Sequence, residues 1–150
     1  MRTATIIIGV GNPVLTDDSV GLKIAAELRN RGLATAQVHS GGMELMETMT
    51  GYDRAIVIDA MVSGRPPGTI RELGPADLPA TRNAHSTHDA SLPVALELGR
   101  MAGLRLPGEI RIWGVEAGDV VTVGEGLTPA VERAVPRVVE RVMRDLRRNQ

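Results

Sequence analysis

Two adjacent carboxylates, Asp17 and Asp18, follow a short apolar run and a glycine turn near the start of the chain. A third carboxylate, Asp59, comes directly after another apolar run, and His85 and His88 lie further along the sequence. Carboxylate oxygens and imidazole nitrogens, with one position left open, suit a divalent ion such as nickel or zinc. Such an ion would polarise a carbonyl and acidify a water molecule.

Each of these residues also has a structural interpretation. Asp17 and Asp18 could cap the helix that follows them or complement its dipole. Asp59 could accept hydrogen bonds from loop amides at the end of a buried strand. The remaining histidine, His39, is typical of a polar strand end. The local pattern therefore leaves both interpretations open, and it does not choose between the other two histidines.

The elements that must position these residues alternate between strands and helices. Apolar runs and turn signals predict strands over Thr5–Ile8, Ala36–His39, Ala55–Ile58, Thr69–Leu73 and Glu109–Val115. Apolar residues at helical spacing predict helices over Ser19–Arg31, Met43–Met49 and Ser91–Gly103, and a last helix that begins at Thr128-Pro129. Alternation of this kind predicts an α/β fold in three layers, α/β/α, with helices on both faces of a twisted, mostly parallel but mixed sheet of about five strands.

The order of the strands determines which side chains can meet. If the first three strands lie in the order 2-1-3, strands 1 and 3 are neighbours and their carboxyl ends border one crevice. Asp18 and Asp59 are therefore expected to be partners there. The short connection before Thr69–Leu73 favours an antiparallel edge strand. The long segment from Gly74 to His88 lacks periodicity and predicts a functional loop that begins near the same edge.

Composition excludes several classes of function. The 150 residues are 43% hydrophobic, which fits one domain over residues 1–150, and the absence of cysteine excludes thiolate nucleophiles and thiolate metal sites. With one Trp, one Tyr, no Phe and a net charge of -1, a nucleic-acid partner is not expected. No window approaches the roughly 18 apolar residues of a membrane span, so we expect a cytoplasmic protein without a membrane partner.

Known catalytic and nucleotide motifs fit poorly. Gly9-Val10-Gly11 follows a strand as in a dinucleotide fingerprint, but Val14 stands at the third glycine position and two aspartates would face the pyrophosphate. The sequence contains neither Gly-x-Ser-x-Gly nor His-Glu-x-x-His. A non-enzymatic nucleotide-binding module is therefore only a minor alternative.

Several motifs, in this order along the chain, resemble the maturation proteases of NiFe hydrogenases. The resemblance covers nearly the whole chain and is carried by Gly9-Val10-Gly11-Asn12, Thr16-Asp17-Asp18-Ser19-Val20-Gly21, Gly41-Gly42, Val57-Ile58-Asp59-Ala60, Pro67-Gly68-Thr69, Ser86-Thr87-His88 and Gly126-Leu127-Thr128-Pro129. It implies a phosphorylase/hydrolase-like fold, and it implies that Asp18, Asp59 and His88 are both the metal ligands and the catalytic residues. Relatives often carry Glu where this chain has Asp18, and an acid is common where it has His39-Ser40.

The resemblance also implies a function. We expect a nickel-dependent endopeptidase that removes the C-terminal extension of a NiFe-hydrogenase large-subunit precursor after nickel insertion. The nickel is expected to be carried by that precursor and not to reside in the free enzyme, with zinc or cadmium able to replace it in crystals. We expect a monomer. The alternative enzyme hypothesis is a hydrolase of small peptides or amides with a resident metal.

Overall fold

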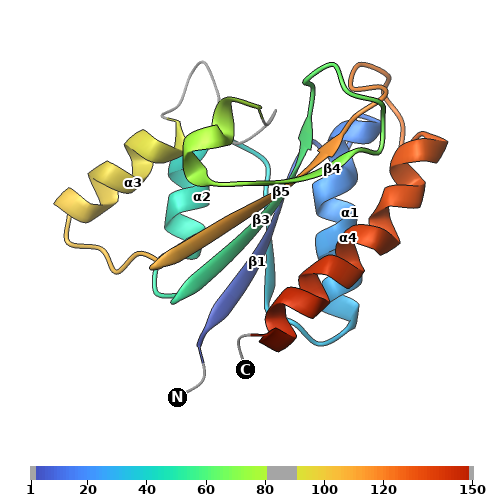
Figure 1. The fold of residues 1–150 in the computed structure, drawn as a ribbon. Helices are drawn as coiled ribbons and strands as arrows, with labels where there is room; N and C mark the ends of the chain where they lie inside the picture. Colours follow the sequence, from blue (N-terminus) through green and yellow to red (C-terminus); the bar gives the residue numbers. More distant parts are fainter. Residues whose placement is uncertain (1–2, 81–90, 149–150) are drawn as a thin grey trace.

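A computed structural model describes residues 3–80 and 91–148 of the chain. It contains a five-stranded sheet in the order β2-β1-β3-β5-β4 (Figure 1). The strands are β1 (Thr5–Val10), β2 (Thr35–Val38), β3 (Arg54–Met61), β4 (Ile70–Leu73) and β5 (Glu109–Glu116). The helices are α1 (Val20–Asn30), α2 (Gly42–Met49), α3 (Leu92–Met101) and α4 (Pro129–Arg148), with short 3-10 helices η1 (Asp17–Ser19) and η2 (Pro75–Ala80).

The pairing of the strands confirms the predicted mixed sheet. Strands β2, β1, β3 and β5 run parallel, so β1 lies between β2 and β3 as expected. Strand β4 pairs antiparallel with β5 and forms an edge. The predicted elements all form, with boundaries shifted by a few residues. The segment predicted as a loop after Gly74 begins with η2, and residues 81–90 lie outside the described part of the chain.

Two apolar cores form, one on each face of the sheet. Helices α2 and α3 cover one face, and α1 and α4 cover the other (Figure 1). Aliphatic side chains fill both cores, and three buried methionines, Met46, Met49 and Met61, add to the α2/α3 core. Flexible thioethers occupy space that aromatic rings fill in most proteins, which fits the low aromatic content. In the described ranges, no helix is both long and apolar enough to cross a bilayer.

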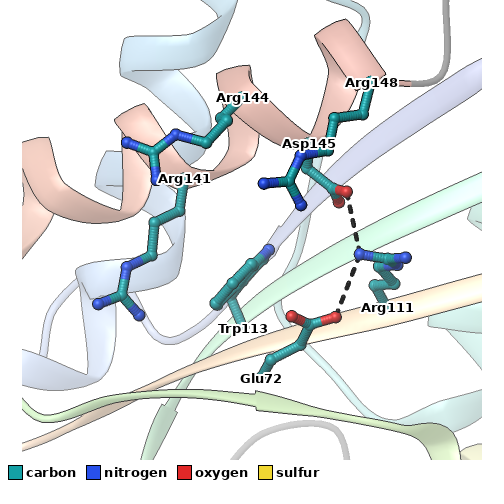
Figure 2. A pocket seen from close by; sticks show the side chains of 7 residues that line it. All are labelled: Glu72, Arg111, Trp113, Arg141, Arg144, Asp145 and Arg148. Carbon is teal, nitrogen blue, oxygen red and sulfur yellow. Dashed lines mark hydrogen bonds and ion pairs between the residues drawn. The ribbon is translucent and has the colours of Figure 1, made fainter.

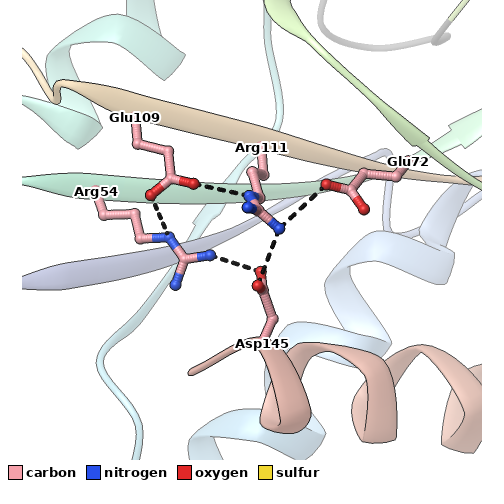
Figure 3. Close-up of polar contacts among 5 residues, drawn as sticks. All are labelled: Arg54, Glu72, Glu109, Arg111 and Asp145. Atoms are coloured by element: carbon pink, nitrogen blue, oxygen red, sulfur yellow. Dashed lines mark hydrogen bonds and ion pairs between the residues drawn. The ribbon is translucent and has the colours of Figure 1, made fainter. Parts of the chain in front are cut away.

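An ion network around the buried pair Arg54 and Asp145 joins the sheet to the C-terminal part of α4 (Figure 3). Arg54, at the start of β3, is only 2% exposed and pairs with Asp145 at 2.6 Å and with Glu109 at 3.0 Å. Arg111 contacts Asp145 at 2.9 Å, and it also pairs with Glu109 and Glu72. Asp145 therefore links two arginines of adjacent parallel strands to the helix.

The network also changes the pKa of Arg111. Burial alone would lower the pKa of this guanidinium, but the hydrogen bond to Glu109 and the charges of Asp145, Glu109 and Glu72 outweigh it and raise the pKa above its usual value. Arg111 therefore remains a fixed positive charge within the network.

Replacing Asp145 tests how much this network stabilises the fold. Asp145→Asn leaves the buried guanidinium of Arg54 without its closest counter-charge, and we expect a loss of about 3 kcal/mol in the free energy of unfolding. Urea denaturation measures it. Glu140→Gln is the matched control, because Glu140 forms only an exposed ion pair with Arg31 at 3.7 Å. Equal losses in the two variants would contradict a structural role for the buried pair of Arg54 and Asp145.

Candidate functional site

The loop that follows β1 is tied to the loop that follows β5. The backbone N–H of Thr16 donates to the carbonyl of Thr122 at 3.0 Å, and Leu15 forms a β-bridge with Val123. The N–H of Asp17 donates to the carbonyl of Asp119 at 2.8 Å. These bonds place the turn that carries Asp17 and Asp18 at the carboxyl edge of the parallel strands.

Asp17 is a structural residue that holds the start of α4. Its fully buried carboxylate accepts hydrogen bonds from the N–H groups of Gly118 (2.7 Å) and Asp119 (2.8 Å). It also accepts the N–H of Thr128 at 2.8 Å and its hydroxyl at 2.7 Å. The sequence allowed a capping role for Asp17 at its own helix, but the residues that it caps belong to the loop before α4 and to Thr128 directly ahead of that helix.

Asp119 holds a second part of the loop between β5 and α4, at Val121 and Thr122. Hydrogen bonds from the hydroxyl and backbone N–H of Thr122 and from the N–H of Val121 lower the pKa of Asp119 below its usual value. The two backbone bonds are 3.0 Å long. The loop is therefore held by carboxylates at two points, one supplied by Asp17 and one by its own sequence.

Asp18 points elsewhere, toward the end of β1. The residue is 1% exposed, and its carboxylate accepts the backbone N–H of Asn12 at 3.3 Å. A Cβ added to Gly11 would collide with the carbonyl oxygen of Asp18, so the two backbones are in direct contact. The two adjacent aspartates thus have different partners. Asp17 binds the loop before α4, whereas Asp18 binds the backbone that follows β1.

Asp59 is fully buried inside β3. The sequence predicted that the strand ends at Ile58, directly before Asp59, which is wrong, because β3 continues to Met61 by pairing with β5. The register with β1 ends earlier, at Gly9 and Ile58, so beyond this point only β5 extends the ladder. The Asp59 carboxylate accepts the N–H of Ala60 at 2.8 Å.

The face on which Asp59 lies follows from strand alternation. Its neighbours Ile58 and Ala60 belong to the core under α1 and α4, whereas Val57 and Met61 belong to the core under α2 and α3. Because successive side chains of a strand point to opposite faces, Asp59 lies on the α2/α3 face. The chain enters α3 at Leu92 on this same face.

The structure brings the segments of Asp18 and Asp59 together. Turn η1 contacts β3, and a Cβ on Gly21 would collide with the carbonyl oxygen of Ile58 and lie 2.7 Å from that of Val10. The first turn of α1 therefore packs directly against the backbones of β1 and β3. Its contact with β3 is at Ile58, one residue before Asp59. Two buried carboxylates thus come from neighbouring segments at one edge of the sheet.

Of the three histidines, only His39 lies in the described part of the chain. His39 is exposed directly after β2. His85 and His88 fall in residues 81–90, outside the described residues, and His88 is four positions before Leu92, the first residue of α3. Within residues 3–80 and 91–148, no group of three His, Cys, Asp or Glu side chains forms a metal cluster.

Exposed apolar side chains that the sequence did not predict surround the carboxyl edge of the sheet. Val14, Val62, Val121 and Val123 follow the carboxyl ends of β1, β3 and β5 and are between 54% and 81% exposed. The bridge between Leu15 and Val123 joins two of these loops. For Val121 and Val123 the sequence offered a signal, because apolar residues between Gly118 and Gly126 lie in a loop that predicts no buried face.

Comparisons with known proteins agree with one another. A sequence model of the family described as hydrogenase maturation protease matches residues 24–145. The hydrogenase 2 maturation protease of Escherichia coli (strain K12) is 33% identical over 149 residues, covering 95% of this chain and 90% of the relative.

Solved structures give the same result. The hydrogenase maturating endopeptidase HybD from E. coli has a TM-score of 0.79 and 30% sequence identity, and the match covers 99% of this chain and 93% of that one. The NiFe hydrogenase maturation protease HybD from Thermococcus kodakarensis shares the fold, with a TM-score of 0.73 at 24% identity over 96% of this chain and 98% of that one.

The different roles of the two adjacent aspartates can be tested by matched substitutions. In Asp17→Asn, an amide group that donates hydrogen bonds replaces an oxygen that accepts them, and we expect the free energy of unfolding to fall by about 2 kcal/mol. Asp18→Asn makes the same chemical change beside Asn12, where one amide oxygen can still accept the N–H, so we expect a smaller loss. Chemical denaturation of both variants measures the difference. Equal losses would contradict the assignment.

Proposed function

Since this chain belongs to the hydrogenase maturation protease family and is an endopeptidase, we propose that its substrate is the large-subunit precursor of a NiFe hydrogenase. The enzyme removes a C-terminal extension from this precursor after nickel insertion. The proposal extends to the residues of the site: Asp18, Asp59 and His88 engage the nickel that the precursor carries.

The contact between η1 and β3 is the observation that carries this proposal. It brings the segments of two buried carboxylates, Asp18 and Asp59, to one edge of the sheet. Burying carboxylates is costly, and the cost is offset where they bind a cation. Asp17 is also buried in this region, but its carboxylate accepts four hydrogen bonds that hold the loop before α4, so we assign it a structural role.

The donor set fits nickel. Carboxylate oxygen and imidazole nitrogen are ligands that a borderline divalent ion accepts, and His88 supplies the imidazole from the segment that leads into α3. A divalent ion at this place polarises a carbonyl and acidifies a water molecule. Asp18 and Asp59 orient the loaded precursor, so that the scissile bond lies beside the carboxylates only when nickel is present. Nickel is then a recognition feature that makes cleavage conditional on correct loading.

The exposed valines support a protein as the substrate. Val14, Val62, Val121 and Val123 border the same edge as the carboxylates and offer apolar contact area to a folded partner. A hydrolase of small peptides with a resident metal would not need these exposed valines to bind its substrate.

A cleavage assay on nickel-loaded and nickel-free precursor tests the proposal. Asp18→Ala, Asp59→Ala and His88→Ala should each reduce cleavage of the loaded precursor by more than the roughly hundredfold typical of an outer-shell partner, with the fold retained. The C-terminal mass of the precursor is the measurement. Glu47→Gln on the exposed side of α2 and His85→Ala serve as matched controls that retain cleavage. Normal trimming by the Asp59→Ala enzyme would refute the proposal.

Metal analysis of the purified enzyme separates the proposal from its rival. If nickel arrives with the precursor, the enzyme alone contains far less than one equivalent of metal and does not hydrolyse simple peptides. Stoichiometric, tightly held zinc together with turnover of such peptides would favour the resident-metal hydrolase.

A further inference from the structure

A pocket of about 330 Å³ lies between the C-terminal half of α4 and the edge of the sheet formed by β5 and β4 (Figure 2). Four arginines, two carboxylates and the single tryptophan line it. Helix α4 supplies Arg141, Arg144 and Arg148, whereas the candidate nickel site lies at the carboxyl edge on the α2/α3 side. The pocket is therefore a separate feature of the molecule.

The charges in the pocket are not balanced. The lining carboxylates of Glu72 and Asp145 both bind Arg111, at 3.3 and 2.9 Å, and Asp145 also binds Arg54. By contrast, none of the ion pairs among the described residues includes Arg141, Arg144 or Arg148. Four arginines against two carboxylates leave two positive charges in excess. A pocket in which guanidinium groups outnumber carboxylates attracts an anion.

Trp113 gives a second, independent indication of a ligand. The residue is 7% exposed, and its indole N–H has no acceptor within the described part of the chain. A buried donor without an acceptor is costly, and a ligand oxygen would supply one. The guanidinium carbon of Arg141 lies 5.9 Å from the centre of the ring, within cation–π range, so the ring also positions one of the arginines.

We propose that this pocket binds a small dianion, either a phosphate monoester or a dicarboxylate. Its two negative charges match the excess of two positive charges, and its oxygens accept hydrogen bonds from the guanidinium groups. The volume is at the lower end of the range for small-molecule sites, which suits a compact ligand. The bound dianion bridges α4 to β5 and stabilises the docking of the helix on the sheet.

Trp113 is the only tryptophan, so its fluorescence reports directly on the pocket. The protein is titrated with inorganic phosphate in one arm and with succinate in another, at constant ionic strength set by chloride, and calorimetry accompanies both. We expect a saturable change in fluorescence and a matching binding heat in at least one arm. The tighter of the two ligands identifies the chemical class. Chloride alone should give no saturation.

Substitutions on α4 test whether the signal comes from the pocket. Arg144→Gln and Arg148→Gln should each weaken binding by about tenfold, which corresponds to the loss of one charge-assisted hydrogen bond. Arg133→Gln is the matched control, because Arg133 is exposed on the same helix and does not line the pocket. Absence of saturable binding in both arms, or equal weakening by Arg133→Gln and Arg144→Gln, would overturn the proposal. Cleavage of the hydrogenase precursor does not enter this test, so its outcome is independent of the proposed protease site.

Discussion

The direct contact between the first turn of α1 and the backbones of β1 and β3 is the constraint on which the site depends. Added Cβ atoms at Gly9 and Gly21 would collide with the carbonyl oxygens of Gly21 and Ile58. Neither glycine has a positive φ, so each is needed for space and not for its backbone conformation. Helix α1 contacts β1 and β3 without intervening side chains. The turn η1, which precedes α1, therefore lies at the edge of the sheet, close to Asp59.

The contact of α1 with β1 and β3 explains why the adjacent residues Asp17 and Asp18 have different partners. Asp17 turns outward to the loop that precedes α4 and fixes it with four hydrogen bonds, whereas Asp18 turns back to the end of β1. Asp17 thus stabilises the loop that borders the site, whereas the carboxylate of Asp18 faces the end of β1. The two roles are coupled, because a shift of η1 would displace both carboxylates together.

Much of the fold could be predicted from the sequence, because local periodicity encodes it. The parallel order of β2, β1 and β3 and the antiparallel edge strand β4 follow from apolar runs and connection lengths, and both are confirmed. The end of β3 was predicted three residues too early, at Ile58 instead of Met61, because a charged residue usually marks a strand end. Here the pairing with β5 carries the strand past Asp59.

The interactions that could not be predicted are those between segments far apart in the sequence. No local pattern shows that Asp17 binds Thr128, or that Arg54 at the start of an apolar strand pairs with Asp145 near the end of the chain. Placing Asp18 and Asp59 at one edge required only strand order, which is why that part of the site could be predicted. His88 belongs to residues 81–90, so its position beside the carboxylates stays a prediction.

Anomalous X-ray diffraction from crystals of this enzyme grown with zinc, as a replacement for nickel, shows whether Asp18, Asp59 and His88 share one metal ion. We expect one anomalous peak within about 2.2 Å of a carboxylate oxygen of Asp18, a carboxylate oxygen of Asp59 and an imidazole nitrogen of His88. A zinc ion bound elsewhere, with these three side chains too far apart to share it, would contradict the proposed nickel site.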